Sequence, residues 1–154
     1  MKALVRMCLP VGLLLFSCVV SAADKSKTDD KSKTEVKPLC PVTGKAIDRN
    51  VSLDYKSGTV YFSSPEAMKK FQDDVEKYAA KANLQLVLTG QARQTACPLM
   101  GKPIVPGKSV VVAGVKVELC CNMCKTKITK AKPEEQLEMV FGAGFDKGYT
   151  VKKA

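Results

Sequence analysis

Histidine is absent from the sequence, and aromatic residues are few, with four tyrosines and five phenylalanines. The first absence removes the commonest metal ligand and the usual partner of a nucleophilic cysteine. The second excludes the interleaved aromatic and arginine pattern of single-stranded nucleic-acid platforms. The formal net charge of +10 is carried by lysines spread along the chain, so we interpret it as a solvated surface and expect no nucleic-acid partner. Nothing suggests a catalytic pair or a phosphate loop, so we expect no enzyme.

Long hydrophobic runs are also missing after residue 20. The N-terminus has Lys2 and Arg6, an apolar run over 9–20 and small residues at 20–23, which together are typical of a cleavable signal peptide at 1–22. The run is short for a membrane span of about 20 apolar residues. We therefore expect an exported protein, periplasmic or secreted, with no membrane span. As an alternative, Cys18 ends a lipobox-like stretch and would become a lipidated N-terminus.

After a Lys-, Ser- and Thr-rich stretch at 23–38, predicted to be a flexible linker, the chain repeats itself. CPVTGKAI at 40–47 recurs as CPLMGKPI at 97–104, and the same register lays 60–64 on 117–121. Matches in register indicate two copies of one module. The predicted boundaries are a degenerate first copy at 39–81, a connector at 82–94, a cysteine-bearing second copy at 95–142 and a C-terminal tail at 143–154.

Each copy is predicted to fold as a cysteine knuckle, a β-hairpin and a helix, which gives the chain an α+β class. In the first copy, strands at 51–55 and 59–62 flank a glycine-containing loop. Ser64 is the expected N-cap of a helix with Pro65 at its first position. The helix is expected to bury one apolar stripe at helical spacing, formed by Met68, Phe71, Val75 and Tyr78.

The second copy has predicted strands at 109–112 and 115–119, followed by a helix from about Asn122 to Lys132. Pro133 then opens a second helix, which glycines at 142 and 144 end. Between the copies, residues 84–88 alternate enough to form a strand but also suit the end of a helix.

The cysteines of the second copy form the strongest constellation. Once Cys8 and Cys18 leave with the signal peptide, five cysteines remain: Cys40, Cys97, Cys120, Cys121 and Cys124. An odd count with three thiols inside five residues fits a disulfide framework poorly and makes metal binding an alternative. We expect the Cys-Pro-x-x-Gly turn to expose the Cys97 thiol. The hairpin then returns Cys120 or Cys121, and Cys124 at a helix start, to its side.

At these residues the sequence resembles the YHS domains and the related TRASH metal-sensing modules. The resemblance rests on the Cys-Pro-x-x-Gly-Lys knuckles, on Tyr-x-x-Gly-x-x-Tyr-Phe at 55–62 and on Leu-Cys-Cys-x-x-Cys-Lys at 119–125, and it covers about 39–81 and 96–132. It implies small treble-clef-like or zinc-ribbon-like modules that handle or sense heavy metals, often copper. By this resemblance Cys97, Cys120 and Cys124 fall on the family's cysteine positions, and Cys121 matches a doubled cysteine of some members.

The first copy departs from this pattern, because Ser63, Ser64 and Ala67 stand where the second copy has cysteines. We predict that it is a packing module without a site. Cys40 and Met100 are candidates for additional ligands of the second copy's site, since a thioether together with thiolates selects Cu(I). The alternative for Met100 is that it fills a gap beneath the hairpin.

Three or four cysteines without histidine suit Cu(I), which tolerates two or three thiolates, and leave Zn(II) as the alternative. We therefore predict an exported protein that captures, buffers or delivers a thiophilic ion through the second copy, with an envelope metal-handling protein as a partner. One alternative is a secreted interaction module whose cysteines form disulfides, for instance Cys97 with Cys120 or Cys124. Another is a thiol-disulfide redox protein that uses the CxxC at 121–124.

Overall fold

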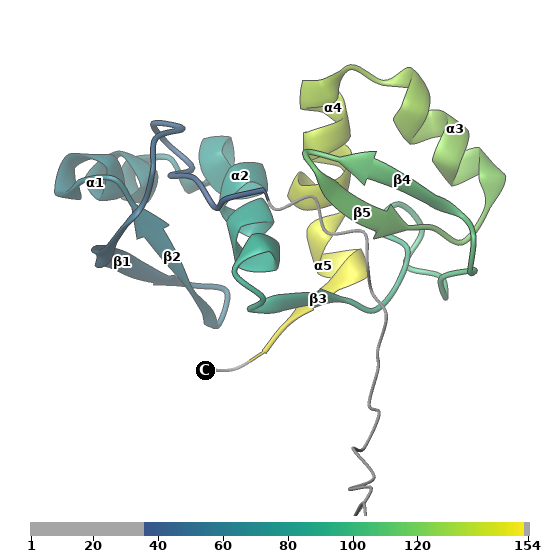
Figure 1. Ribbon diagram of the computed structural model, residues 1–154, viewed down its shortest axis with the longest axis horizontal. Helices are drawn as coiled ribbons and strands as arrows, with labels where there is room; N and C mark the ends of the chain where they lie inside the picture. The colour runs from purple at the N-terminus through teal and green to yellow at the C-terminus, as the bar shows by residue number, and fades with distance from the viewer. Residues whose placement is uncertain (1–35, 153–154) are drawn as a thin grey trace, which may run out of the picture. The chain divides into compact units, whose positions relative to one another are not determined.

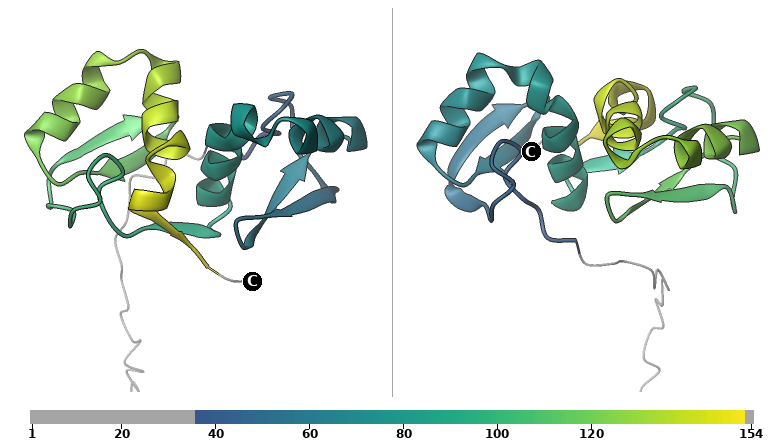
Figure 2. Two further views of the ribbon diagram at one scale, coloured as in Figure 1. Left: turned by 180° about the vertical axis from the view of Figure 1, so that it is seen from behind. Right: turned by 90° about the horizontal axis from the view of Figure 1, so that it is seen from above.

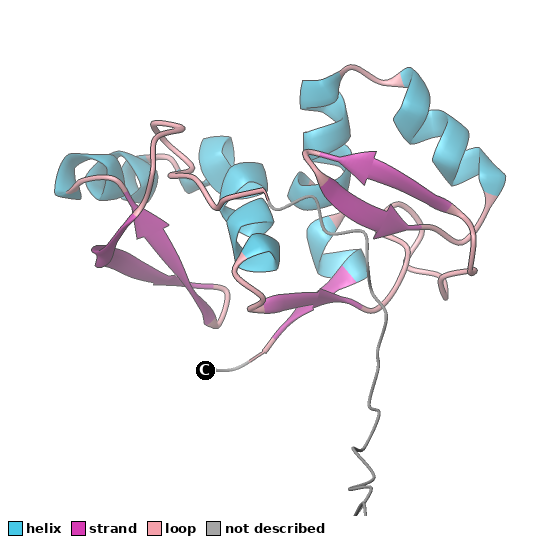
Figure 3. Cartoon of the chain, in the orientation of Figure 1, coloured by secondary structure: helices cyan, strands magenta, loops and turns pink. Residues whose placement is uncertain are grey.

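The structure is a computed structural model that describes residues 36–152. Within this range, two-stranded antiparallel sheets alternate with helices (Figures 1 and 3), which confirms the predicted α+β class. The predicted signal peptide at 1–22, and the predicted linker up to residue 35, lie outside the described residues. No helix among the described residues combines the length and the apolar character that a membrane crossing requires. Below, 39–88 is called the first half and 96–148 the second half.

In the first half, the turn that carries Cys40 is followed by a hairpin of β1 (Asp48–Tyr55) and β2 (Gly58–Phe62). Both turn residues, Lys56 and Ser57, have positive φ angles of 48° and 67°. A two-residue type I′ turn requires this conformation, because its twist matches that of the strands it joins. The predicted strands at 51–55 and 59–62 are confirmed, and β1 begins earlier than predicted.

The helix predicted after this hairpin is present but divided. α1 (Pro65–Asp73) begins at the predicted N-cap, where Ser64 Oγ accepts a hydrogen bond from the N–H of Ala67 at 3.3 Å. The chain leaves helical geometry at Asp74, and the side chain of Asp74 caps α2 (Val75–Leu88). The prediction of a single buried apolar stripe is wrong at Val75, which is 36% exposed, whereas Phe71 is buried as predicted. A capping aspartate after α1 restarts the helix and so changes which face is buried.

The second half also has a hairpin followed by a helix. β4 (Ser109–Val112) and β5 (Val115–Glu118) flank Ala113 and Gly114, which both have positive φ. α3 (Asn122–Lys130) starts where predicted and ends before Pro133, which cannot continue it. Pro133 opens α4 (Pro133–Leu137), which runs into a π-helical turn, η1 (Glu138–Gly142), and is followed by α5 (Phe145–Gly148).

Contacts between residues far apart in sequence join the two halves. Residues 84–88, for which the sequence allowed a strand or a helix, form the end of α2. β3 (Ala92–Gln94) then pairs antiparallel with β6 (Tyr149–Val151). The Asn83 side chain donates a hydrogen bond to the carbonyl of Phe141 at 2.6 Å, so that α2 and η1 lie side by side (Figure 2). The buried side chains of both halves form one hydrophobic core.

Three glutamines bind the free edge of a hairpin through backbone hydrogen bonds: Gln91 at Thr59, Gln85 at Tyr61 and Gln94 at Glu118. Gln85 accepts a hydrogen bond from the N–H of Tyr61 at 2.7 Å and donates one to the Tyr61 carbonyl at 2.8 Å. Gln94 does the same with Glu118, at 3.0 Å and 2.6 Å. Tyr61 and Glu118 occupy the same place in the repeat. In both halves a side-chain amide takes the place of a further strand and protects the edge.

Candidate metal centre

The knuckle that carries Cys97 is a tight turn closed by its own backbone. The N–H of Cys97 donates to the carbonyl of Lys102 at 2.9 Å, and the N–H of Gly101 donates to the carbonyl of Cys97 at 2.7 Å. Gly101 has a φ of 65°, in the left-handed region that glycine adopts without steric cost. A Cβ on Gly148 would lie 2.7 Å from Pro98 Cα, so α5 packs directly against the knuckle. This packing fully buries Cys97, whereas the sequence predicted an exposed thiol.

The opposite side of the site is the segment between β5 and α3. Leu119 is fully buried, its N–H donates to the carbonyl of Lys108 at 2.7 Å, and its carbonyl accepts from the N–H of Val105 at 3.0 Å. Cys120 therefore follows an anchored residue. Cys121 is the N-cap of α3, with extended backbone angles, and Cys124 lies in the first turn of the helix.

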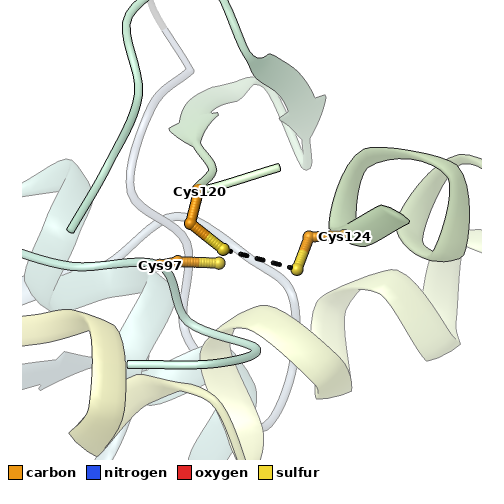
Figure 4. A group of neighbouring side chains, drawn as sticks. All are labelled: Cys97, Cys120 and Cys124. Atoms are coloured by element: carbon orange, nitrogen blue, oxygen red, sulfur yellow. Dashed lines mark hydrogen bonds between the residues drawn. The ribbon is translucent and has the colours of Figure 1, made fainter. Parts of the chain in front are cut away.

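Three thiols converge between these two elements. The Sγ atoms of Cys97, Cys120 and Cys124 all lie within 4.8 Å of one another, and those of Cys120 and Cys124 are 3.7 Å apart (Figure 4). With a metal–sulfur bond of about 2.3 Å, neighbouring sulfurs of a tetrahedral site lie roughly 3.8 Å apart and those of a trigonal site roughly 4 Å apart. The three thiols are therefore nearly at the spacing of metal ligands. We call Cys97, Cys120 and Cys124 the inner triad.

Cys121 lies beside the inner triad without belonging to it. Its Sγ is 3.5 Å from Cys124 Sγ. This separation is far from the disulfide bond length of about 2.05 Å. All five cysteines within 36–152 are free thiols, so the structure contains none of the disulfides that the sequence left open.

The four thiols of this cluster differ in acidity. Burial raises the pKa of Cys97, but the backbone N–H groups of Cys120 and Met100 outweigh it, and the net pKa is lowered. The pKa of Cys121 is lowered, first by the backbone N–H of Cys124 at the start of α3. Burial and neighbouring thiols raise the pKa of both Cys120 and Cys124. An ion bound by the inner triad would therefore displace protons from Cys120 and Cys124.

The two further candidate ligands are Cys40 and Met100. The Cys40 thiol is buried in the first half, against the side chains of Thr43 and Ser63, and it is not a member of the three-thiol group. Burial raises its pKa, but hydrogen bonds from Thr43 and Ser63 outweigh burial and lower the pKa to about 7. The Met100 side chain is 55% exposed, so it does not fill a gap beneath the hairpin.

Two features beside these thiols were missed by sequence reasoning: the exposure of Met123 and the pairing of the Thr43 and Ser63 hydroxyls. Met123, between Cys121 and Cys124, is 79% exposed, and no sequence pattern indicated this. The hydroxyl pair of Thr43 and Ser63, with oxygens 2.8 Å apart beside Cys40, could have been found from the repeat register, which places Ser63 on Cys120.

Comparison of the chain with models of known protein families, with curated proteins and with solved structures finds no match. The site therefore has to be interpreted from its own geometry.

Proposed function

We propose that this protein is an exported metal-binding protein that captures, buffers or delivers one thiophilic ion through Cys97, Cys120 and Cys124. The observation that carries the proposal is the convergence of three thiol sulfurs within 4.8 Å of one another, from a knuckle and a helix start that are far apart in sequence. Free thiols at ligand spacing, two of them buried, suit an ion that prefers sulfur.

Cu(I) is the ion that this ligand set favours. Three thiolates satisfy Cu(I), whereas a structural Zn(II) site needs four ligands. Cys121 is the nearest candidate for a fourth, and its sulfur lies outside the inner triad. Zn(II) with Cys121 or a water molecule as its fourth ligand is the alternative.

The proposed family is that of the YHS and TRASH-like modules, arranged as a tandem pair of treble-clef-like units with a degenerate first copy. Matched backbone geometry supports this proposal. The Cys40 knuckle repeats the hydrogen bonds of the Cys97 knuckle, with Cys40 N–H to Lys45 O at 2.8 Å and Gly44 N–H to Cys40 O at 2.9 Å. The predicted signal peptide supports a periplasmic or secreted location, where an envelope metal-handling protein would be the partner.

A second candidate function is thiol-disulfide exchange. One close pair of sulfurs, Cys121 and Cys124 at 3.5 Å, belongs to a CxxC sequence at a helix start, which is the redox arrangement. Thiol counting distinguishes the two functions, because a redox protein purified without reductant would carry this pair as a disulfide and a metal carrier would keep four free thiols in the cluster.

Titration of the reduced chain, without its signal peptide, with Cu(I) in the absence of oxygen tests the proposed function. We expect about one tightly bound ion and ultraviolet absorption from the thiolate–copper bonds. The variant with Cys97, Cys120 and Cys124 all changed to serine should bind none. Cys40→Ser is the matched control, because it removes a buried thiol outside the cluster and should leave the stoichiometry unchanged. Equal binding by the triple variant would exclude the inner triad as the site.

A further inference from the structure

The position of Cys121 has no evident structural role. As the N-cap of α3 it makes no side-chain capping hydrogen bond, although the N–H groups of the first turn lower the pKa of its thiol. The corresponding residue of the first half, Ser64, caps α1 through its hydroxyl. A serine cap is worth about 1 kcal/mol over a residue that cannot cap. The second half therefore carries a thiol at the position where the first half has a hydroxyl cap.

The thiol of Cys121 instead faces the other thiols. It lies 3.5 Å from Cys124, and the thiols of Cys120 and Cys121 each shift the pKa of the other. Cys120, Cys121 and Cys124 are a second possible set of three ligands, which we call the outer triad. Unlike the sulfurs of the inner triad, these three sulfurs do not all lie within 4.8 Å of one another, so the Cys121 side chain has to turn toward the ion to complete the set. It shares two members with the inner triad and replaces Cys97 with Cys121.

The two triads differ in access to solvent. Cys97 is completely buried beneath the knuckle and Cys124 is only 5% exposed, whereas Cys120 and Cys121 are both partly exposed. Met123, two residues after Cys121, also has an exposed side chain. A ligand from another molecule can therefore reach the cluster only on the side of Cys120 and Cys121.

We propose that Cys121 is the exchange ligand of the site, which moves the bound ion from the inner triad to the outer triad for transfer to an acceptor. This inference rests on the proposed function. In the step, a bond forms between Cys121 Sγ and the ion while the bond to Cys97 Sγ breaks. Cys121 loses its proton to solvent and Cys97 takes one up, so the charge of the site is unchanged and no electron is transferred.

This step explains why four thiols are present where three suffice to bind the ion. With Cys97 released, all three remaining ligands belong to the segment 120–124, and the partly exposed side of that segment faces an approaching acceptor. Because a new bond forms as the old one breaks, the ion never has fewer than three sulfur ligands. The class of acceptor this geometry suits is a soft ligand, a thiolate or a thioether, presented by a partner protein or a small chelator.

The test is the rate of ion transfer. The chain loaded with one equivalent of Cu(I) is mixed, without oxygen, with an excess of a chromogenic Cu(I) chelator, and the absorbance of the chelator complex is followed by stopped flow. We expect Cys121→Ser to bind close to one ion and to release it more slowly, by about 10 to 100-fold, the range typical for groups that assist metal ligands. Cys40→Ser, a matched cysteine-to-serine control outside the cluster, should transfer at the wild-type rate.

A folding defect would not account for slower transfer by Cys121→Ser, because serine is a better N-cap than cysteine. The metal-free Cys121→Ser chain should therefore be at least as stable as the wild-type chain in thermal unfolding. Transfer by Cys121→Ser at the wild-type rate would overturn the exchange role and leave the proposed function intact. Loss of Cu(I) from Cys121→Ser at equilibrium would also overturn it, since Cys121 would then be a permanent ligand. Failure of the wild-type chain to bind Cu(I) or Zn(II) would instead overturn the proposed function.

Discussion

In the first half, the place of Cys120 is taken by Ser63, whose hydroxyl pairs with that of Thr43, and the place of Cys124 is taken by Ala67, which is 2% exposed. The knuckle of this half nevertheless has the same hydrogen bonds as that of the second half, and the same left-handed glycine, Gly44 with a φ of 68°. The backbone arrangement therefore forms without a thiol cluster. The comparison teaches that the cluster is an addition to this arrangement and not its support.

The two halves also differ in the side chains that occupy equivalent core positions. Phe62 and Phe71 lie with ring centroids 5.3 Å apart in the first half, and the same places in the second half hold Leu119 and Ile128. All four side chains are buried. Aromatic pairs add about 0.5 to 1.5 kcal/mol beyond the apolar area they bury. At these two places the first half has an aromatic pair and the second half has aliphatic side chains, although the second half also buries Phe141 and Phe145 against Tyr149. A bound ion would add stability to the second half.

The largest effect is expected from removing this aromatic packing. Phe71→Ala should lower the free energy of unfolding by about 3 to 5 kcal/mol, because it deletes a fully buried ring and leaves a cavity. Cys40→Ser should be mild, since a serine hydroxyl can bond to Thr43 and Ser63 in place of the thiol. Denaturant unfolding of the metal-free chain measures both. A larger loss for Cys40→Ser than for Phe71→Ala would show that Cys40 has a bonding role in the first half.

Single substitutions in the second half should affect metal affinity and not the backbone arrangement. Cys97→Ser, Cys120→Ser or Cys124→Ser should each weaken Cu(I) binding by more than about 100-fold, because losing a ligand costs more than losing a group that supports one. Cys121→Ser should have a smaller effect, and Met100→Leu a smaller one still, in competition titrations with a chelator.

If the serine substitutions affected Cu(I) binding in the opposite order, the assignment of the ligands would have to change. If Cys121→Ser abolished binding while Cys120→Ser did not, the ion would be bound by Cys97, Cys121 and Cys124. Cys120 would then be a packing thiol, and the exchange role of Cys121 would be excluded as well.

The comparison can be sharpened by rebuilding the cluster in the first half. Ser63→Cys combined with Ala67→Cys would place two thiols beside Cys40, in the register of the inner triad. We expect the chain to bind a second Cu(I) ion, detected by native mass spectrometry, at a cost of about 1 to 3 kcal/mol from the extra volume at buried Ala67. Ser64→Cys alone is the matched control and should add no second ion. A double variant that folds but still binds one ion would show that the two knuckles are not equivalent.

The smallest effect concerns the pH dependence of stability. The pKa of Cys40 is about 7 in the folded chain, below its ordinary value of 9.0. Between these values the unfolded chain holds a proton that the folded chain has lost, so stability rises with pH from about 7 to 9 and the contribution is lost as the pH falls through 7. Cys40→Ser should remove this part of the slope in denaturant titrations, and identical slopes for both chains would contradict a thiolate at Cys40.

Several elements follow from the sequence alone because neighbouring residues decide them. The two hairpins, the N-cap at Ser64, the start of α3 at Asn122 and the helix opened by Pro133 all have local signals, and the structure confirms each of them. The knuckle, hairpin and helix start predicted for the second copy also brought Cys97 together with Cys120 or Cys121 and with Cys124 as candidate ligands.

Other features were decided only by tertiary structure, because they depend on contacts between residues far apart in sequence. The short strands β3 and β6 pair across the chain without any pattern of their own, and the approach of α5 to Pro98 buries the Cys97 thiol. The separation of Cys121 from the inner triad likewise depends on the side-chain directions set where β5 meets α3. Spacing along the sequence shows which thiols are available, and the packing of the knuckle against α5 decides which of them face inward.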